Sequence, residues 1–283
     1  MTTLQKKIDF AVVFSVENAN PNGDPLNGNR PRQNFDGFGE VSDVCIKRKL
    51  RNRLQDEGER IFVQSDERAT DGHKSLKDRA DAIEELVALK KQKKNPDVAL
   101  YAKRAADEWF DVRAFGQVFA FSGDTLSVGV RGPVSIHPAI SLQPITITST
   151  QITKSVNSVT KDGKSSDTMG MKHRVDFGVY KFVGSINTQL AEKTGFTNDD
   201  AQKLKQALIT LFENDASSAR PDGSMEVLKV YWWEHNNALG QYSSAKVHRS
   251  LRVTLPEDAK NIEQLTYELE ELEGLTPTIC DGK

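Results

Sequence analysis

Residues 8–16 carry the first clear hydrophobic pattern in the chain. Apolar residues stand at every second position from Ile8 to Val16, and Ala11 and Val13 make much of the opposite face apolar as well. A strand with two apolar faces is typical of the middle of a sheet, so we predict a central strand here. The following residues, 18–32, are rich in Asn, Pro and Gly, which disfavour regular structure, and we predict a loop.

Residues 44–55 predict an amphipathic helix with a basic face. Ser42 is a candidate N-cap, because its hydroxyl can accept a hydrogen bond from a backbone N–H of the first turn. Apolar residues recur four positions apart and form a stripe that would face a core. At 100° per residue, three basic side chains share the opposite face: Lys47, Arg48 and Arg51.

Other helical patterns follow later in the chain. Residues 60–115 contain two stretches with helical spacing and predict a helical insertion. Residues 201–212 form a clear amphipathic helix behind Thr197 and Asp200, which resemble a capping box. The acidic stretch 257–273 is predicted to form a terminal helix.

The remaining patterns predict strands on both sides of a long polar stretch. Residues 149–174 are mostly polar, and a polar loop of that length is usually functional or disordered. Apolar runs predict strands within residues 117–147, 175–186, 225–233 and 247–255. Without the insertions the element order is βαββαβ, which is the order of a ferredoxin-like split βαβ fold. The predicted fold class is therefore α+β.

Length and composition set broad limits. The chain has 283 residues, enough for one large or two small domains with a sizeable core. It has no apolar run near the ~18 residues of a membrane span and no pattern of a cleavable signal at the N-terminus. Its two cysteines lie far apart without a CxxC motif, which argues against a disulfide scaffold or a cysteine-rich zinc site. These features predict a cytoplasmic protein without membrane contacts.

The charge is unevenly distributed. A net charge of −2 alone argues weakly against nucleic-acid binding. Residues 257–283 hold eight acidic and two basic residues, so the rest of the chain has 36 basic against 32 acidic residues and a net charge of +4. The acidic tail thus masks a mildly basic body, and local basic clusters matter more than the total.

Recognisable motifs of catalysis and metal binding are absent from the sequence. No two of the five histidines lie at metal-ligand spacing, and no HExxH, GxSxG, P-loop or GxGxxG pattern occurs. Residues 20–24 resemble the start of a calcium loop, but Pro31 stands where the bidentate Glu would be required. We therefore predict no metal ion and no cofactor. The loop is either an ordinary Asx-rich turn or a site of close approach to a ligand.

The loop and the basic helix together predict a nucleic-acid interface. Glycines let backbone N–H groups approach a phosphate, Asn amides donate to phosphate and sugar oxygens, and arginines supply charge. Both segments follow the first strand, so both lie at one end of the sheet. A phosphate backbone crossing that end would meet the helix and six side chains of the loop, namely Asn18, Asn20, Asn22, Asn29, Arg30 and Arg32.

At these residues the sequence resembles a known family. The matching segments are VVFSVENANPNGDPLNGNRPR (12–32), VSDVCIKRKLRNRL (41–54), RAFGQVF (113–119), VRGPVSI (130–136), TMGMKHRVDFGVYKFVGSIN (168–187) and WWEHNNALG (232–240). In this order they resemble the repeated backbone subunit of the type I-C CRISPR surveillance complex, from the repeat-associated mysterious protein superfamily. The combination covers most of the chain.

The resemblance implies a fold and a function. The palm would be an RNA-recognition-motif-like ferredoxin fold, with helical fingers at 60–115 and a hairpin thumb at 149–174 inserted into one domain, 1–283. The subunit would be non-catalytic and would polymerise along guide RNA beside neighbouring copies and other subunits of the complex. It would present the guide for pairing with target DNA. Further implied RNA contacts are Arg131, Lys154, Lys172 and Arg174, and the thumb residues Met169 and Met171 would part stacked bases, unless they pack against the palm.

Two other functions stay open at this point. A guide-processing endoribonuclease of the same superfamily would need a general base near the scissile phosphate, and His173 between Lys172 and Arg174 is the one such cluster. A small-molecule or metal-binding module would use the 18–32 loop. The sheet aromatics of base-stacking RNA-recognition motifs are largely missing, and Phe177 and Phe182 are predicted to be core.

Overall fold

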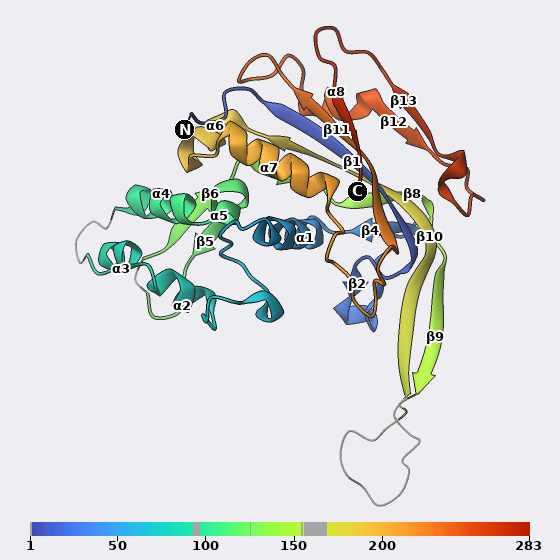
Figure 1. Ribbon diagram of the computed structural model, residues 1–283, viewed down its shortest axis with the longest axis horizontal. Coiled ribbons are helices and arrows are strands. Elements are labelled where there is room, and N and C mark those ends of the chain that lie inside the picture. The colour runs from blue at the N-terminus through green and yellow to red at the C-terminus, as the bar shows by residue number, and fades with distance from the viewer. Residues whose placement is uncertain (1, 93–96, 125, 154, 156–168) are drawn as a thin grey trace, which may run out of the picture.

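The chain folds around an antiparallel sheet with helices packed against it. The computed structural model describes residues 2–92, 97–124, 126–153, 155 and 169–283. Eight strands form the main sheet: β1 (Ile8–Ala19), β4 (Phe38–Val41), β7 (Val134–Ile136), β8 (Ala139–Pro144), β9 (Ile147–Thr153), β10 (Met169–Ile186), β11 (Met225–Glu234) and β14 (Thr278–Asp281). The order along the sheet is β14-β11-β1-β10-β8-β4, and β7 and β9 also pair with β10 (Figure 1). The predicted α+β class is confirmed.

β1 is the central strand, as its two apolar faces predict. It pairs along its length with β10 on one side and with β11 on the other, both antiparallel. Phe10, Val12 and Phe14 are buried on one face of the sheet, while Ala11 and Val13 are buried on the other. A strand covered on both faces and paired at both edges leaves little for water to reach, which is why its polar positions are few.

Two long helices cover one face of the sheet. They are α1 (Asp43–Asp56) and α7 (Asn198–Ile209), and their apolar stripes join the same core as Phe10 and Phe14. Ser42 accepts a hydrogen bond from the third residue of α1, and Thr197 forms a capping box with Asp200 at the start of α7. The caps predicted from the sequence are therefore confirmed.

The opposite face is covered by the C-terminal part of the chain, where two predictions are wrong. Residues 247–255 do not form one strand, because α8 (Ser244–Ser250) precedes a short β12 (Leu251–Thr254). The acidic stretch 257–273 contains β13 (Thr266–Leu269), which pairs with β12, instead of a terminal helix. The pairing buries part of Tyr267 against the sheet, and this tertiary contact outweighs the helical propensity of the glutamates.

Residues 60–131 form a helical unit with its own core beside α1 (Figure 1). It contains α2 (Leu76–Asp81), α3 (Glu84–Lys90), α4 (Val98–Glu108), α5 (Phe110–Phe115) and the hairpin of β5 (Gly116–Phe119) and β6 (Val128–Arg131). Phe62, Trp109 and Phe119 pack ring against ring at its centre. The predicted helices are present, although the first is divided into α2 and α3, and the strands predicted within residues 117–147 begin with this hairpin.

A two-stranded arm leaves the sheet next to β8. β10 is 18 residues long, and its first part pairs with β9 from Met169 opposite Thr153 to Val175 opposite Ile147. Figure 1 shows this β9/β10 hairpin projecting from the body of the molecule. The polar stretch 149–174 is thus not all loop, because its described ends are paired strands. Residues 154 and 156–168 of this stretch lie outside the described residues.

Candidate nucleic-acid interface

Two asparagines of the loop after β1 serve the fold. Asn20 is buried, and its Nδ2 donates to the carbonyl oxygen of Asn29 at 2.7 Å while its backbone N–H donates to Ala219 at 2.9 Å. The Oδ1 of Asn22 accepts hydrogen bonds from the backbone N–H and the hydroxyl of Ser42, at 3.0 and 2.9 Å. These side chains tie the loop to the start of α1. The predicted ligand contact of Asn20 would require its buried amide to become accessible.

The other predicted loop residues reach the surface. Asn18 and Asn29 are exposed and have left-handed backbones, with φ of 53° and 60°. Arg30 and Arg32 are half-buried on a small hairpin made by β2 (Gly23–Asp24) and β3 (Arg30–Pro31). Arg32 has Nη2 at 3.7 Å from Asp24, and its buried Nε has no hydrogen-bond partner. Guanidinium N–H groups thus remain for a ligand.

This hairpin lines a polar cavity of about 320 Å³, which we call the arginine cavity. Its walls include the two arginines, the amides of three side chains and two carboxylates: Arg30, Arg32, Asn27, Gln33, Asn34, Asp24 and Glu40. Such donors are those that hold phosphate and sugar oxygens in protein–nucleic-acid complexes.

The predicted basic face of α1 is largely taken up by contacts within the protein. The Nε of Arg51 donates to the buried carboxylate of Asp111 at 2.8 Å, and this carboxylate also accepts from the backbone N–H groups of Phe62 and Val63. The Nη1 of Arg48 donates to the carbonyl oxygen of Val63 at 2.7 Å, and burial lowers the pKa of Arg48 below its usual value. Arg51 and Arg48 therefore dock the helical unit on α1 instead of pointing into solvent.

The remaining candidates differ in their surroundings. Lys47 is half-buried, with its ammonium 3.0 Å from Asp43 one turn earlier. Arg131 is exposed on β6 in the helical unit, on the other side of α1 from the β2/β3 hairpin (Figure 1). Lys172 and Arg174 are exposed on β10, and Arg174 lies 3.8 Å from Asp176. Lys154 lies outside the described residues.

A chain of hydrogen bonds joins the loop to the base of the β9/β10 hairpin. The Nη1 of Arg30 donates to the Oγ of Ser149 at 2.8 Å, and Ser149 Oγ lies 2.8 Å from Nδ1 of His173. Because a guanidinium only donates, the serine hydroxyl accepts from Arg30 and can donate to the imidazole. Arg30 is thus tied to the base of the β9/β10 hairpin on the face that carries His173, whereas Lys172 and Arg174 alternate to the other face of β10.

The two methionines of β10 are exposed. Met169 is 63% and Met171 54% exposed, and Ile152 on β9 is 50% exposed. The alternative that the methionines pack against the sheet is therefore wrong for the isolated chain. Two large apolar side chains on one face of a projecting strand are available to a partner.

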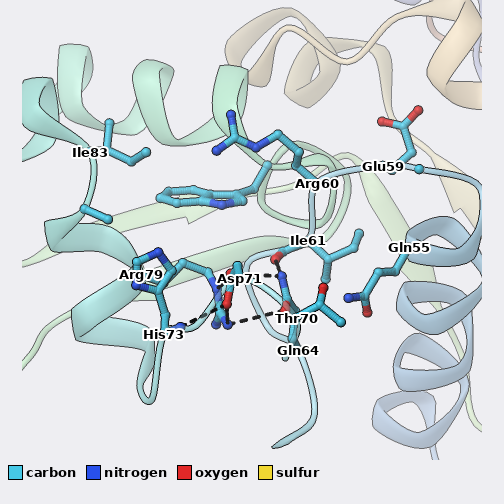
Figure 2. A pocket seen from close by; sticks show the side chains of 13 residues that line it. Gln55, Glu59, Arg60, Ile61, Gln64, Thr70, Asp71, His73, Arg79 and Ile83 are labelled. Carbon is cyan, nitrogen blue, oxygen red and sulfur yellow. Dashed lines mark hydrogen bonds and ion pairs between the residues drawn. The ribbon is translucent and has the colours of Figure 1, made fainter. Parts of the chain in front are cut away.

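A second cavity, of about 410 Å³, lies between the end of α1 and the helical unit (Figure 2). The buried guanidinium of Arg79 contacts the carboxylate of Asp71 through Nε and Nη2 at 2.6 and 3.0 Å, which lowers the pKa of Asp71 to about 2. Arg79 also donates to the carbonyl of Phe62, so the pair fixes the segment before α2. Nothing in the sequence patterns predicts this cavity.

The described residues contain neither a metal-binding cluster nor a membrane-spanning helix. Among the described residues, no group of three or more His, Cys, Asp or Glu side chains could hold a metal ion. No helix in that part of the chain has the length and apolarity needed to cross a membrane.

Sequence comparison identifies the family. The sequence model described as "CRISPR-associated protein Cas7" matches residues 6–270, nearly the whole chain. The chain belongs to the Cas7 family. A curated Cas7 relative, "CRISPR-associated protein Cas7" of Haloferax volcanii, is 28% identical over 237 residues, covering 77% of this chain and 67% of the relative.

The fold also occurs in a solved structure. A chain of a "CRISPR RNA-guided surveillance complex, pre-nicking" is similar with a TM-score of 0.53 and 17% identity, covering 89% of this chain and 83% of that chain. A chain of another "CRISPR RNA-guided surveillance complex" has a TM-score of 0.46 and 16% identity. The first match shows that the mixed α+β fold with its central antiparallel sheet occurs in such assemblies.

Proposed function

We propose that this Cas7-family chain is the guide-RNA-binding backbone subunit of a CRISPR surveillance complex of type I-C. The observation that carries the proposal is the family match over residues 6–270, together with the cationic end of the sheet where Arg30 meets the β9/β10 hairpin. Contacts to phosphates give affinity without reading bases, as a guide of arbitrary sequence requires. The chain would be non-catalytic, and would assemble with copies of itself and other subunits to present the guide to target DNA.

The parts of the molecule have proposed roles. We assign the palm to the split βαβ type, supported by the strand order β11-β1-β10-β8 with α1 and α7 on one face. Residues 60–115 are the fingers and residues 149–174 the thumb of one domain, with Met169 and Met171 as wedge residues. The RNA contacts that we propose are Asn18, Asn29, Arg30, Arg32, Lys47, Arg131, Lys154, Lys172 and Arg174.

Purified protein is expected to bind repeat-containing RNA and leave it intact. Cleavage by a ribose 2′-hydroxyl needs a positioned base and charge stabilisation opposite it, and the one imidazole at this site, His173, is engaged by Ser149. Gel shift, gel analysis of RNA length and mass of the assembly on RNAs of increasing length test this. His173→Ala should bind comparably. A discrete cut by the parent that His173→Ala lacks would establish the endoribonuclease instead.

Loss of phosphate contacts should change the salt dependence of RNA binding. Lys172→Gln with Arg174→Gln removes two exposed cations from β10, and each lost contact should flatten the slope of log affinity against log salt by about 0.7. The matched control is Arg252→Gln with Lys260→Gln, which removes the same charge on the opposite face of the sheet. An unchanged slope in the β10 variant, or equal flattening in both variants, would place the RNA path elsewhere.

A further inference from the structure

Phe35 is presented to solvent by an ordered turn. Its side chain is 110% exposed, as open as in an extended reference peptide. The Oδ1 of Asn34 accepts hydrogen bonds from the backbone N–H groups of Asp36 and Phe38 at 3.0 and 2.9 Å, and Gly37 donates to the carbonyl of Asn34 at 3.1 Å. Gly37 has φ of 83°, which a residue with a side chain adopts only with strain. The turn therefore fixes where the ring stands.

The same turn is fastened to the sheet. The Nε2 of Gln33 donates to the carbonyl oxygens of Gly37 and Ile145 at 3.1 and 3.0 Å, and the backbone N–H of Ile145 donates back to Gly37 at 3.0 Å. Ile145 lies between β8 and β9, so the turn is tied to the root of the β9/β10 hairpin. Because the backbone that carries Phe35 is already ordered, little backbone entropy is lost when the ring meets a ligand.

Polar and cationic residues flank Phe35 in the sequence. Phe35 directly follows Gln33 and Asn34, which line the arginine cavity with Arg30 and Arg32. Acidic neighbours are present as well: Asp24, Asp36 and Glu40. Arg32 lies 3.7 Å from Asp24, and Arg30 is occupied by an uncharged hydroxyl, so Arg30 keeps its full charge for a phosphate. A cation beside a free aromatic face is the pairing that holds single-stranded nucleic acid.

We propose that Phe35 stacks on one unpaired base of bound single-stranded RNA while Arg30 and Arg32 contact the adjacent phosphate. This rests on the proposed function and adds a stacking residue to the proposed backbone contacts and the wedge residues Met169 and Met171. Stacking uses the π-face that every base has, so it is compatible with guides of any sequence. One aromatic ring per subunit leaves the other bases free to pair.

An apolar contact with another protein fits the surroundings less well. The second fully exposed apolar side chain of this segment, Leu26, is 98% exposed and stands on the β2/β3 hairpin, separated from Phe35 along the chain by Asn27, Asn29, Gln33 and Asn34. Interfaces between proteins usually need contiguous apolar patches of a few hundred Å². The polar groups between these two side chains favour a nucleotide as the occupant.

The test compares Phe35→Ala, Phe35→Leu and Phe35→Trp with the parent on short single-stranded RNAs that carry one abasic site, moved along the strand. Loss of one stacked base should weaken binding about 5- to 150-fold in Phe35→Ala and in Phe35→Leu, and Phe35→Trp should bind as the parent does. The salt slope should stay that of the parent. An abasic site at one position of the RNA should weaken RNA binding by the parent by a similar factor. The same abasic site should not weaken RNA binding by Phe35→Ala any further.

Other outcomes overturn the inference in distinguishable ways. If the parent binds intact RNA fully and Phe35→Ala binds it with the same affinity, the stacking role alone is overturned. A different result would make the ring a contact between copies of the chain. In that case, without RNA, Phe35→Ala loses self-association and Phe35→Leu keeps it, while the RNA affinity of both variants is unchanged. Failure of the parent to bind any of the RNAs overturns the proposed function and this inference together. Leu26→Ala is the matched control, expected to bind RNA like the parent.

Discussion

Replacing residues 153–171 by a short Gly/Ser linker is expected to abolish assembly along RNA and to leave the fold intact. The described residues at the ends of the replaced segment and next to it, 149–153 and 169–174, are exposed or half-buried, and core packing begins at Val175. Because the sequence between them is mostly polar, we expect little loss of buried apolar area and a cooperative melting transition close to that of the parent. A copy without the projecting arm cannot reach its neighbour.

The measurement is the mass of complexes formed on RNAs of increasing length. The parent should add copies as the RNA lengthens, and the linker variant should not. The Lys172→Gln and Arg174→Gln variant serves as a control, because it keeps the arm and loses two of its charges. RNA-length-dependent oligomers of the linker variant would show that the thumb is wrongly assigned.

Asp111→Ala is expected to destabilise the protein by about 3–5 kcal/mol, the usual cost of removing one partner of a buried ion pair. The carboxylate has no exposed surface and accepts hydrogen bonds from Arg51, Phe62 and Val63. Without it, two backbone N–H groups and a guanidinium that is 11% exposed lose their acceptor. The helical unit would lose its main polar attachment to α1.

Urea unfolding followed by circular dichroism measures this effect. Glu268→Ala is the matched control, because the pair of Arg252 and Glu268 is exposed with its charges 3.9 Å apart, and such pairs contribute about 0–1 kcal/mol. Adding Arg51→Met to Asp111→Ala removes the unpaired charge and should recover part of the loss. A loss below 1 kcal/mol in Asp111→Ala would mean that water reaches the site and replaces the carboxylate.

Local patterns were sufficient where structure depends on neighbours in the sequence. Ser42 and Thr197 mark the starts of α1 and α7 because a cap is a contact over three residues. The alternation in β1 predicts a strand because both its faces are buried. The strand predicted over 247–255 is wrong because its local pattern is ambiguous. Val247 and Leu251 fit the alternation of a strand, but their spacing of four also fits a helix. The N-cap at Ser243 favours the helix α8.

The candidate site was less predictable, because long-range partners decide which polar side chains are free. Arg51 looks solvated on a helical wheel, yet its partner Asp111 is 60 residues away. Lys49 is likewise buried against Asp215, 166 residues away. Asn20 is also buried, and its backbone N–H donates to the carbonyl oxygen of Ala219, which is distant in the sequence. Phe35 was missed although its flanking residues, Asn34 and Asp36, mark a turn that holds the ring outside a core.

The placement of β1 at the centre of the sheet has a consequence for synthesis on the ribosome. β1 ends at Ala19, but its partner β10 starts at Met169 and β11 only at Met225. At roughly 5–20 residues per second, this apolar strand emerges about 8–30 s before its first partner. Its two open edges can pair with other nascent chains during that time. Lower growth temperatures slow translation and lengthen the time during which the edges of β1 are unpaired. Yields of folded protein should therefore depend on nascent-chain chaperones more than on the stability of the finished fold.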